Sequence, residues 1–265
     1  MPLSPLLAPY DHVLLDLDGC VWVGDACTRR APEALTELRA AGKQVCFITN
    51  DARHAPEEFV RKLWSLGLQA SLEEVVTVGA AIQFLLAEQR PGATAYVIGS
   101  PAIFRHVTEA GVTVVDRADD DRPVDVVIVA GHDDFRFEEL RTATQAVLRG
   151  AELIAAGRDR TFPMPDGPWP GTGAIVAALE YATERTATVI GKPEPQLFIT
   201  ALDRLGDGRA LVIGDRLDAD LSGASAAGLD AAIVLTGVTT RVDAEAATDP
   251  APVAVAEDLY ALVAG

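Results

Sequence analysis

The chain is poor in cysteine and lacks the patterns of secreted, zinc-binding or membrane-spanning proteins. Its 265 residues include three cysteines, with no CxxC spacing and no even set that would suggest a disulfide framework. The first residues contain no basic segment followed by a long apolar one, and no apolar run reaches the roughly 18 residues that a membrane helix needs. We therefore expect a cytoplasmic protein with reduced thiols.

Positive charge is also scarce. There are 22 basic and 39 acidic residues, so the formal net charge is −17. Such a charge repels nucleic acids and anionic membranes, and we expect neither as a partner. An anionic substrate would therefore need a local positive group, from a bound metal ion or a lysine. With 49% apolar residues the chain is not disordered, and it is long enough for one large domain or two smaller ones.

Strand patterns and helix patterns alternate along the chain, which predicts a parallel sheet with helical crossovers. Strands are expected at 12–17, 43–50, 73–79, 94–99, 112–115, 124–131, 152–157, 210–215 and 231–237, and helices at 32–42, 56–67, 80–90, 101–111, 137–150, 173–185 and 195–206. The stretch 161–173 is so rich in proline and glycine that we predict neither helix nor strand there. We expect a core formed by residues 1–79 and 186–265 and an inserted α/β module at 80–185.

Acidic side chains stand where several predicted strands end. In the segment VLLDLDG, Asp16 and Asp18 alternate with leucines, so an extended chain would point both carboxylates to the same side. Thr49 and Asp215 end two further strands. Ligands of open α/β sheets bind at the carboxyl ends of strands, and we expect these groups, with Asp220 and Lys192, to share one crevice.

This set of side chains suits phosphoryl transfer. Clustered carboxylates need a cation, and oxygen ligands of this kind favour Mg²⁺. One aspartate could attack phosphorus while a second serves as acid and then base. A hydroxyl and an ammonium group nearby would bind phosphoryl oxygens.

Four motifs in this order, DLDGCVW, ITND, GKPEP and GDRLDAD, resemble those of the haloacid dehalogenase (HAD) superfamily. The first, third and fourth resemble its NagD-like branch of phosphatases. The resemblance implies a Rossmann-like, doubly wound core with an inserted α/β cap domain of the C2 type. It also implies a Mg²⁺-dependent phosphatase that hydrolyses a small phosphate monoester, such as a sugar, glycerol, glycolate, nucleotide or pyridoxal phosphate, through an aspartyl-phosphate.

The resemblance also assigns roles to individual residues. Asp16 would be the nucleophile and a metal ligand, and Asp18 the acid/base, with its backbone carbonyl on the metal. Thr49, Asn50 and Lys192 would bind the phosphoryl group. Asp215 would bind Mg²⁺, and Asp220 would lie in the site as a ligand or a supporting partner of one.

The inserted module would set substrate specificity, and the candidates there are His132, Asp133, Asp159 and Arg160. The chain departs from the family pattern at Asp51, where the family often has asparagine. For GTG at 171–173 we favour Thr172 as the N-cap of the next helix over a phosphate-binding loop.

Other functions remain open at this point. A phosphotransferase or mutase would use the same aspartyl-phosphate chemistry. A signalling receiver is about half this length, a dehalogenase has no need of Asp18 as a proton donor, and a silent binding protein would not need both Asp16 and Asp18. A homodimer formed through the cap is kept as an alternative to a monomer.

Overall fold

The computed structural model describes residues 3–116, 123–164 and 167–264, which form two compact units. The first unit comprises Met1–Thr49, Pro56–Val76 and Lys192–Gly265, and the second comprises Asn50–Ala55 and Thr77–Gly191. The predicted inserted module, 80–185, lies within the second unit. That unit is longer at both ends and also includes the segment 50–55.

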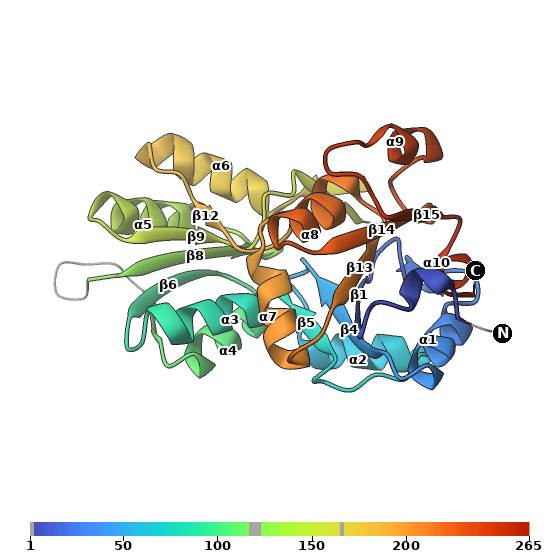
Figure 1. Cartoon of the computed structure of the whole chain (residues 1–265). Helices are drawn as coiled ribbons and strands as arrows, with labels where there is room; N and C mark the ends of the chain where they lie inside the picture. Colours follow the sequence, from blue (N-terminus) through green and yellow to red (C-terminus); the bar gives the residue numbers. More distant parts are fainter. Residues whose placement is uncertain (1–2, 117–122, 165–166, 265) are drawn as a thin grey trace. The chain divides into compact units, whose positions relative to one another are not determined.

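The first unit is built on a six-stranded sheet in the order β15-β14-β13-β1-β4-β5 (Figure 1). The strands are β1 (His12–Asp16), β4 (Gln44–Thr49), β5 (Val75–Thr77), β13 (Ala210–Gly214), β14 (Asp230–Val234) and β15 (Ala254–Ala256). The helices are η1 (Pro5–Leu7), α1 (Ala31–Ala40), α2 (Pro56–Ser65), α7 (Gln196–Leu205), η2 (Leu217–Leu221), α8 (Ser222–Ala226), α9 (Arg241–Ala246) and α10 (Leu259–Ala264). From β15 to β4 every pair of neighbouring strands is parallel.

Both faces of this sheet are covered by helices. Alternate strand residues such as Val13, Leu15 and Phe47 are fully buried in one cluster with side chains of α1, α2 and α10. On the other side, α7 packs against β4 and α8 against β14. The buried strands are therefore apolar on both faces, as the near-continuous hydrophobic runs of the sequence indicate.

The second unit has its own five-stranded parallel sheet, in the order β12-β9-β8-β6-β7. Its strands are β6 (Thr94–Gly99), β7 (Thr113–Val115), β8 (Val126–Gly131), β9 (Glu152–Ala155) and β12 (Thr188–Val189). Helices α3 (Val78–Gln89) and α4 (Pro101–Glu109) cover one face, and α5 (Phe137–Leu148) and α6 (Thr172–Thr183) cover the other (Figure 1). The predicted fold class, a doubly wound parallel core with an inserted α/β module, is confirmed.

Two local predictions are wrong. The stretch predicted to be irregular contains an antiparallel pair, β10 (Thr161–Met164) and β11 (Gly167–Pro170), with Pro163 opposite Pro168. A two-stranded ribbon has outward-facing backbone positions that need no amide donor, so it tolerates proline. Thr172 is not the N-cap of α6: Gly171 holds that position, and the Thr172 hydroxyl donates to the carbonyl of Ala130 at 3.1 Å.

Three small elements had no clear sequence signal. They are the hairpin β2 (Trp22–Val23) and β3 (Ala26–Cys27), the two-residue strand β12 and the short helix α9. Each is shorter than the window over which hydrophobic periodicity can be recognised.

Candidate active site

The carboxyl ends of three neighbouring strands carry the predicted motifs. In the sheet of the first unit, β1 lies between β4 and β13 and pairs in parallel with both. Asp16 is the last residue of β1, Thr49 is the last of β4, and Asp215 follows β13 directly. Since β1 and β4 are joined by a crossover on one side and β13 lies on the other, this edge is the topological switch point of the sheet.

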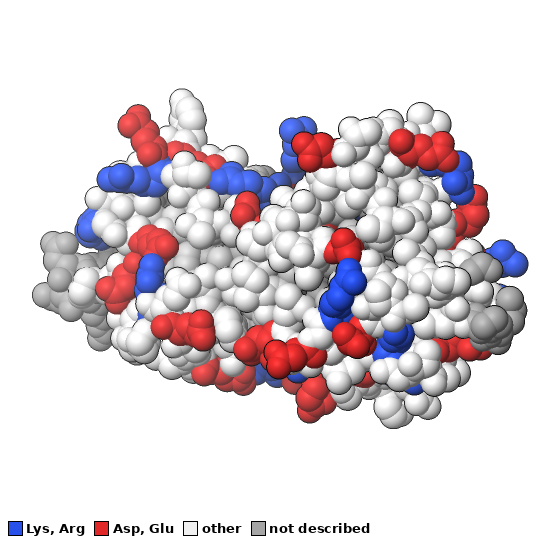
Figure 2. Space-filling view, in the orientation of Figure 1, with Lys and Arg blue, Asp and Glu red and all other residues white. Residues whose placement is uncertain are grey.

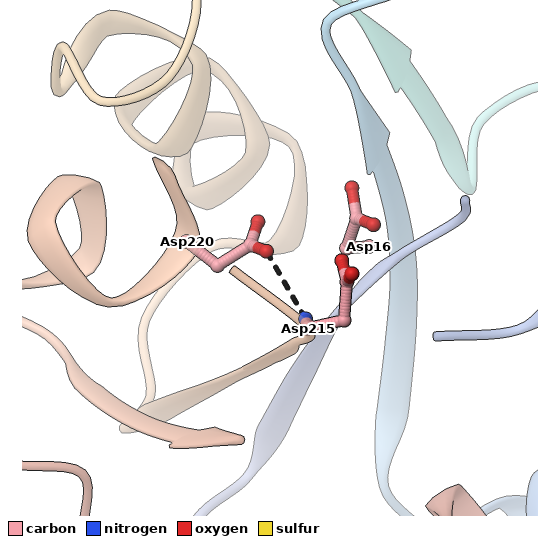
Figure 3. Close-up of side chains that lie close together, drawn as sticks. All are labelled: Asp16, Asp215 and Asp220. Atoms are coloured by element: carbon pink, nitrogen blue, oxygen red, sulfur yellow. Dashed lines mark hydrogen bonds between the residues drawn. The ribbon is translucent and has the colours of Figure 1, made fainter. Parts of the chain in front are cut away.

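Three carboxylates converge there (Figure 3). One oxygen from each of Asp16, Asp215 and Asp220 lies within 4.8 Å of the others. All three residues are buried, with exposed fractions of 7%, 1% and 1%. Carboxylates so close together in a buried place repel one another unless a positive charge lies among them.

Lys192 supplies part of that positive charge. Its ammonium group donates to Oδ1 of Asp16 and, at 2.7 Å, to Oδ1 of Asp220. The lysine is itself buried, with 7% of its surface exposed. It is therefore not the solvated lysine that usually precedes a helix, and it connects β1 with the segment after β13.

Asp220 is held rigidly in the π-helical turn η2. Its Oδ2 accepts hydrogen bonds from the backbone amide of Asp215 at 3.2 Å (Figure 3) and from that of Arg216 at 3.1 Å. The side chain lies directly over Gly214, where an added Cβ would be 2.2 Å from the Asp220 carboxyl carbon. Asp220 thus fixes the backbone around Asp215 and orients Lys192, and it does not act as a helix N-cap.

Burial dominates the electrostatics of the cluster. It raises the pKa of Asp16 to about 8, with Lys192 acting in the opposite direction and Asp220 adding to the rise. Burial also raises the pKa of Asp215 above its ordinary value. Burial alone would lower the pKa of Lys192, but the carboxylates of Asp16 and Asp220 raise it, so the ammonium stays charged.

The residues fit a divalent cation. When all three carboxylates are ionised, the single ammonium leaves an excess negative charge, which a divalent ion would balance. Oδ1 of Asp215 is buried and has no hydrogen-bond partner among the described residues, so it offers an unused oxygen donor at the centre of the cluster. Asp16 and Asp215 are the residues that would hold the ion, because the Asp220 oxygens are taken by Lys192 and the backbone amides.

Asp18 lies outside this cluster. β1 ends at Asp16, so the alternation expected for an extended strand does not continue to Asp18. Its carboxylate is exposed, and its Oδ1 accepts a hydrogen bond of 2.8 Å from Nε1 of Trp22. Trp22 is 1% exposed, so a buried ring in the β2–β3 hairpin holds a carboxylate that water can reach.

The segment after β4 carries the second motif. Thr49 is buried at the end of β4, one residue beyond the pairing of Ile48 with Asp16. Asn50 begins the part of this segment that belongs to the second unit. Asp51 closes a local turn: it accepts from the amide of Arg53 at 2.7 Å and pairs with Nδ1 of His54 at 2.8 Å.

The contacts of Asp51 explain why an aspartate is stable at a position where the family often has asparagine. Burial would raise its pKa, but the hydrogen bonds from His54 and the Arg53 amide outweigh burial and lower it. The carboxylate is therefore ionised within the turn. This departure from the family pattern has a local structural explanation.

The specificity candidates lie in the second unit. His132 follows β8, and its Nε2 is 2.8 Å from Oε1 of Glu139. Asp133 and Arg160 are exposed, and Asp159 is half-buried. His132 is thus hydrogen-bonded to a carboxylate of its own unit, whereas the side chains of Asp133 and Arg160 are accessible to solvent.

Sequence reasoning missed the turn after β14. Within this turn, the amide of Val238 donates to Oδ2 of Asp215 at 2.6 Å. Thr236 donates to the carbonyl of Gly19 at 2.5 Å. A signal was available, because β14 neighbours β13, and a turn that follows β14 must lie beside the end of β13.

A doubly wound parallel sheet with a carboxylate–lysine cluster at its switch point defines a Rossmann-like α/β protein with a candidate phosphoryl-transfer site. Residues 13–113 match the family described as haloacid dehalogenase-like hydrolase, and residues 189–262 match the HAD-hydrolase-like family. The chain belongs to the HAD superfamily and, within it, to the NagD-like branch.

Relatives of known activity cover most of the chain. It is 40% identical to D-glycerol 3-phosphate phosphatase of Mycobacterium tuberculosis, over 89% of this chain and 65% of that protein. It is 33% identical to glycerol-3-phosphate phosphatase of Gallus gallus, over 89% of this chain and 82% of that protein. It is also 33% identical to the acid sugar phosphatase of Staphylococcus aureus, over 89% and 90% of the two chains. The chain thus spans somewhat less than two thirds of the mycobacterial relative's length.

Solved structures agree with this assignment. The glycerol phosphate phosphatase of M. tuberculosis in complex with magnesium superposes with a TM-score of 0.91 at 37% identity, covering 99% of this chain and 79% of that one. A p-nitrophenyl phosphatase from Archaeoglobus fulgidus gives a TM-score of 0.87 at 30% identity, covering 96% and 98% of the chains.

On the face in Figure 2, basic side chains lie singly among acidic ones rather than in a broad patch. Among residues 3–116, 123–164 and 167–264, no helix has the length and apolar character needed to cross a membrane.

Proposed function

We propose that this protein is a Mg²⁺-dependent phosphatase that hydrolyses a small-molecule phosphate monoester through an aspartyl-phosphate on Asp16. One observation carries the proposal: Lys192 joins the carboxylates of Asp16 and Asp220, beside an Asp215 oxygen that has no partner among the described residues. A lysine bridge of this kind orients a nucleophile, and an adjacent unused oxygen suits a cation. The family and the magnesium complex of the mycobacterial relative support the same chemistry.

Asp16 would act as the nucleophile. An oxygen of its carboxylate forms a bond to phosphorus while the bond from phosphorus to the ester oxygen breaks. Lys192 fixes one Asp16 oxygen, so the carboxylate is oriented before substrate arrives, and its charge also attracts the phosphoryl oxygens. Thr49, buried at the end of β4, together with Asn50 would bind the phosphoryl group.

Asp18 would move the protons. As an acid it gives a proton to the departing alcohol, and as a base it then takes one from the water that attacks the phosphorus of the aspartyl-phosphate. Inorganic phosphate leaves and Asp16 is regenerated. The exposure of Asp18 gives water access to it, and the Trp22 indole fixes its direction.

Asp16, Asp215 and the backbone carbonyl of Asp18 would hold Mg²⁺, with Asp220 supporting Asp215. When bound, the ion neutralises charge on the phosphoryl group and keeps the Asp16 carboxylate ionised.

For the substrate we propose a phosphorylated polyol or small sugar, with glycerol phosphate as the first candidate. The named activities of the mycobacterial, avian and staphylococcal relatives support this choice. The second unit would act as the cap that selects among esters. Asp133, Asp159, Arg160 and His132 are the side chains that we propose for substrate selection. The chain's net charge of −17 disfavours large polyanionic substrates.

A panel of esters tests the proposal. Purified protein with Mg²⁺ is given glycerol 3-phosphate, glucose 6-phosphate, phosphoglycolate, pyridoxal phosphate and p-nitrophenyl phosphate, and both alcohol and inorganic phosphate are measured. We expect equal release of the two products, and no release by Asp16→Asn. More alcohol than phosphate would show transfer to an acceptor, and activity retained by Asp16→Asn would overturn the assignment of the nucleophile.

We also propose a cytoplasmic location and self-association through the second unit. The three cysteines are free, and burial raises the pKa of the Cys20 and Cys46 thiols. Phe137 and Tyr181, on the adjacent helices α5 and α6, are 78% and 90% exposed, and burying both side chains against a second copy would favour association. Sedimentation of the wild type and of a Phe137→Ser, Tyr181→Ser double variant tests the self-association: we expect a dimer that the substitutions dissociate.

A further inference from the structure

The carboxylate of Asp215 lies in a slot between two glycines that are far apart in sequence. A methyl group added to Gly19 would lie 2.5 Å from Oδ2 of Asp215, and one added to Gly237 would lie 1.9 Å from the same atom. Real Cβ atoms essentially never come within 3.0 Å of a non-bonded atom, so either methyl group would force Asp215 or the glycine backbone to move. The slot therefore exists only because both positions lack a side chain.

The turn after β14 also holds Asp215 by hydrogen bonds. The Val238 amide donates to Oδ2 of Asp215 at 2.6 Å, and the Thr239 amide donates to its backbone carbonyl at 3.1 Å. The Thr236 hydroxyl donates to the carbonyl of Gly19, which ties the two walls of the slot to each other. A single turn thus fixes the backbone of Asp215, one of its side-chain oxygens and Gly19 on the opposite side of the slot.

These contacts leave the two oxygens of Asp215 in different states. Oδ2 is occupied by Val238, whereas Oδ1 is buried and has no hydrogen-bond partner among the described residues. A freely rotating carboxylate could offer either oxygen or both to an ion. Held in the slot, Asp215 can present only Oδ1, so the direction of the donor is set before a cation binds.

We infer that the turn Thr236–Thr239 is a positioning element of the metal site, in which Gly237, Thr236 and Val238 together orient Asp215 toward the cation. This inference rests on the proposed metal site. It adds to that site a segment distinct from the four motifs, located in the turn after β14, the strand next to β13. Thr236 and Gly237 act through Asp215 and do not contact the reacting atoms.

Two variants test the inference by different routes. Gly237→Ala places a methyl group against Oδ2 and should force the carboxylate to rotate. Gly237 is not among the glycines with positive φ, so alanine introduces no backbone strain of its own. Thr236→Val removes only the hydroxyl that ties Gly19, at nearly constant volume. Thr240→Val is the matched control, because that hydroxyl caps α9 and bonds to Asp243.

The first measurement is the affinity of the full-length protein for Mn²⁺ without substrate. Electron paramagnetic resonance detects the ion and gives the fraction bound. Loss of a group that orients a metal ligand typically weakens binding about 10–100-fold. We expect the Mn²⁺ dissociation constant to rise about 10–100-fold for Gly237→Ala and roughly tenfold for Thr236→Val. It should stay unchanged for Thr240→Val.

The second measurement separates positioning from general damage. In both positioning variants the Mg²⁺ concentration needed for half-maximal turnover should rise, while turnover at saturating Mg²⁺ should return toward the wild-type rate. Unchanged Mn²⁺ affinity in both variants, or no Mn²⁺ binding by the wild type, overturns the inference. If the wild type binds Mn²⁺ but hydrolyses no ester, the proposed function fails, and the Mn²⁺ affinities of the variants still decide the role of the turn.

Discussion

Replacing Lys192 by methionine should destabilise the protein strongly in the absence of metal. Counting side-chain atoms alone, Lys192 is 5% exposed, Asp16 is 10% exposed and Asp220 is 1% exposed. Methionine fills a similar volume but removes the positive charge, so two buried carboxylates lose their common partner. Breaking a buried ion pair from one side typically costs about 3–5 kcal/mol. For a protein of this size, that cost corresponds to a fall of roughly 6–20 °C in the thermal midpoint.

The assay is thermal unfolding followed by circular dichroism, with chelator and with saturating Mg²⁺. Lys62→Met is the matched control, since that lysine is one of three in the chain and stacks on the Trp22 ring, 4.4 Å from its centroid. We expect the Lys62 variant to stay within a few degrees of the wild type. Mg²⁺ should stabilise the Lys192 variant more than the wild type, because the ion replaces part of the lost charge. A Lys192 variant as stable as the wild type in chelator would refute the role assigned to this lysine.

Three further predictions follow from single contacts. Trp22→Phe keeps the buried ring but removes the donor to Asp18, so kcat/KM for alkyl phosphates should fall by about tenfold, while kcat/KM for aryl phosphates, whose leaving group needs no proton, should change little. Gly214→Ala places a Cβ 2.2 Å from the Asp220 carboxyl carbon and should lower both thermal stability and Mg²⁺ affinity; wild-type values for both would contradict the packing described. Thr172→Val removes one hydrogen bond and should cost about 0.5–1.5 kcal/mol in urea unfolding without changing KM.

The sequence predicts the alternation of strands and helices well, because buried parallel strands are near-continuous apolar runs. The strand ending at Asp16 and the strand preceding Asp215 are examples. Their convergence also follows from the sequence, since parallel strands present their carboxyl ends at one edge. The order of the strands, which makes β1 and β13 neighbours, decides that the two carboxylates meet.

Side-chain direction and tertiary contacts account for what the sequence did not predict. Asp18 was expected beside Asp16, but β1 ends between them and the Trp22 indole binds the second carboxylate. Thr172 was expected to cap α6, but its hydroxyl donates to the carbonyl of Ala130 on β8 instead. The slot around Asp215 is formed by glycines more than 200 positions apart, and no local pattern in one sequence reveals such a contact.

The central claim is that Asp16 becomes phosphorylated during turnover. The most direct test is to mix the Asp18→Asn variant with an aryl phosphate and Mg²⁺, quench with acid within milliseconds, and reduce the protein with borohydride. Reduction converts an aspartyl-phosphate into homoserine, which peptide mass spectrometry can assign to a position. The account predicts homoserine at position 16 and nowhere else. Homoserine at another aspartate, or none in a variant that still releases the aryl alcohol in a burst, would contradict it.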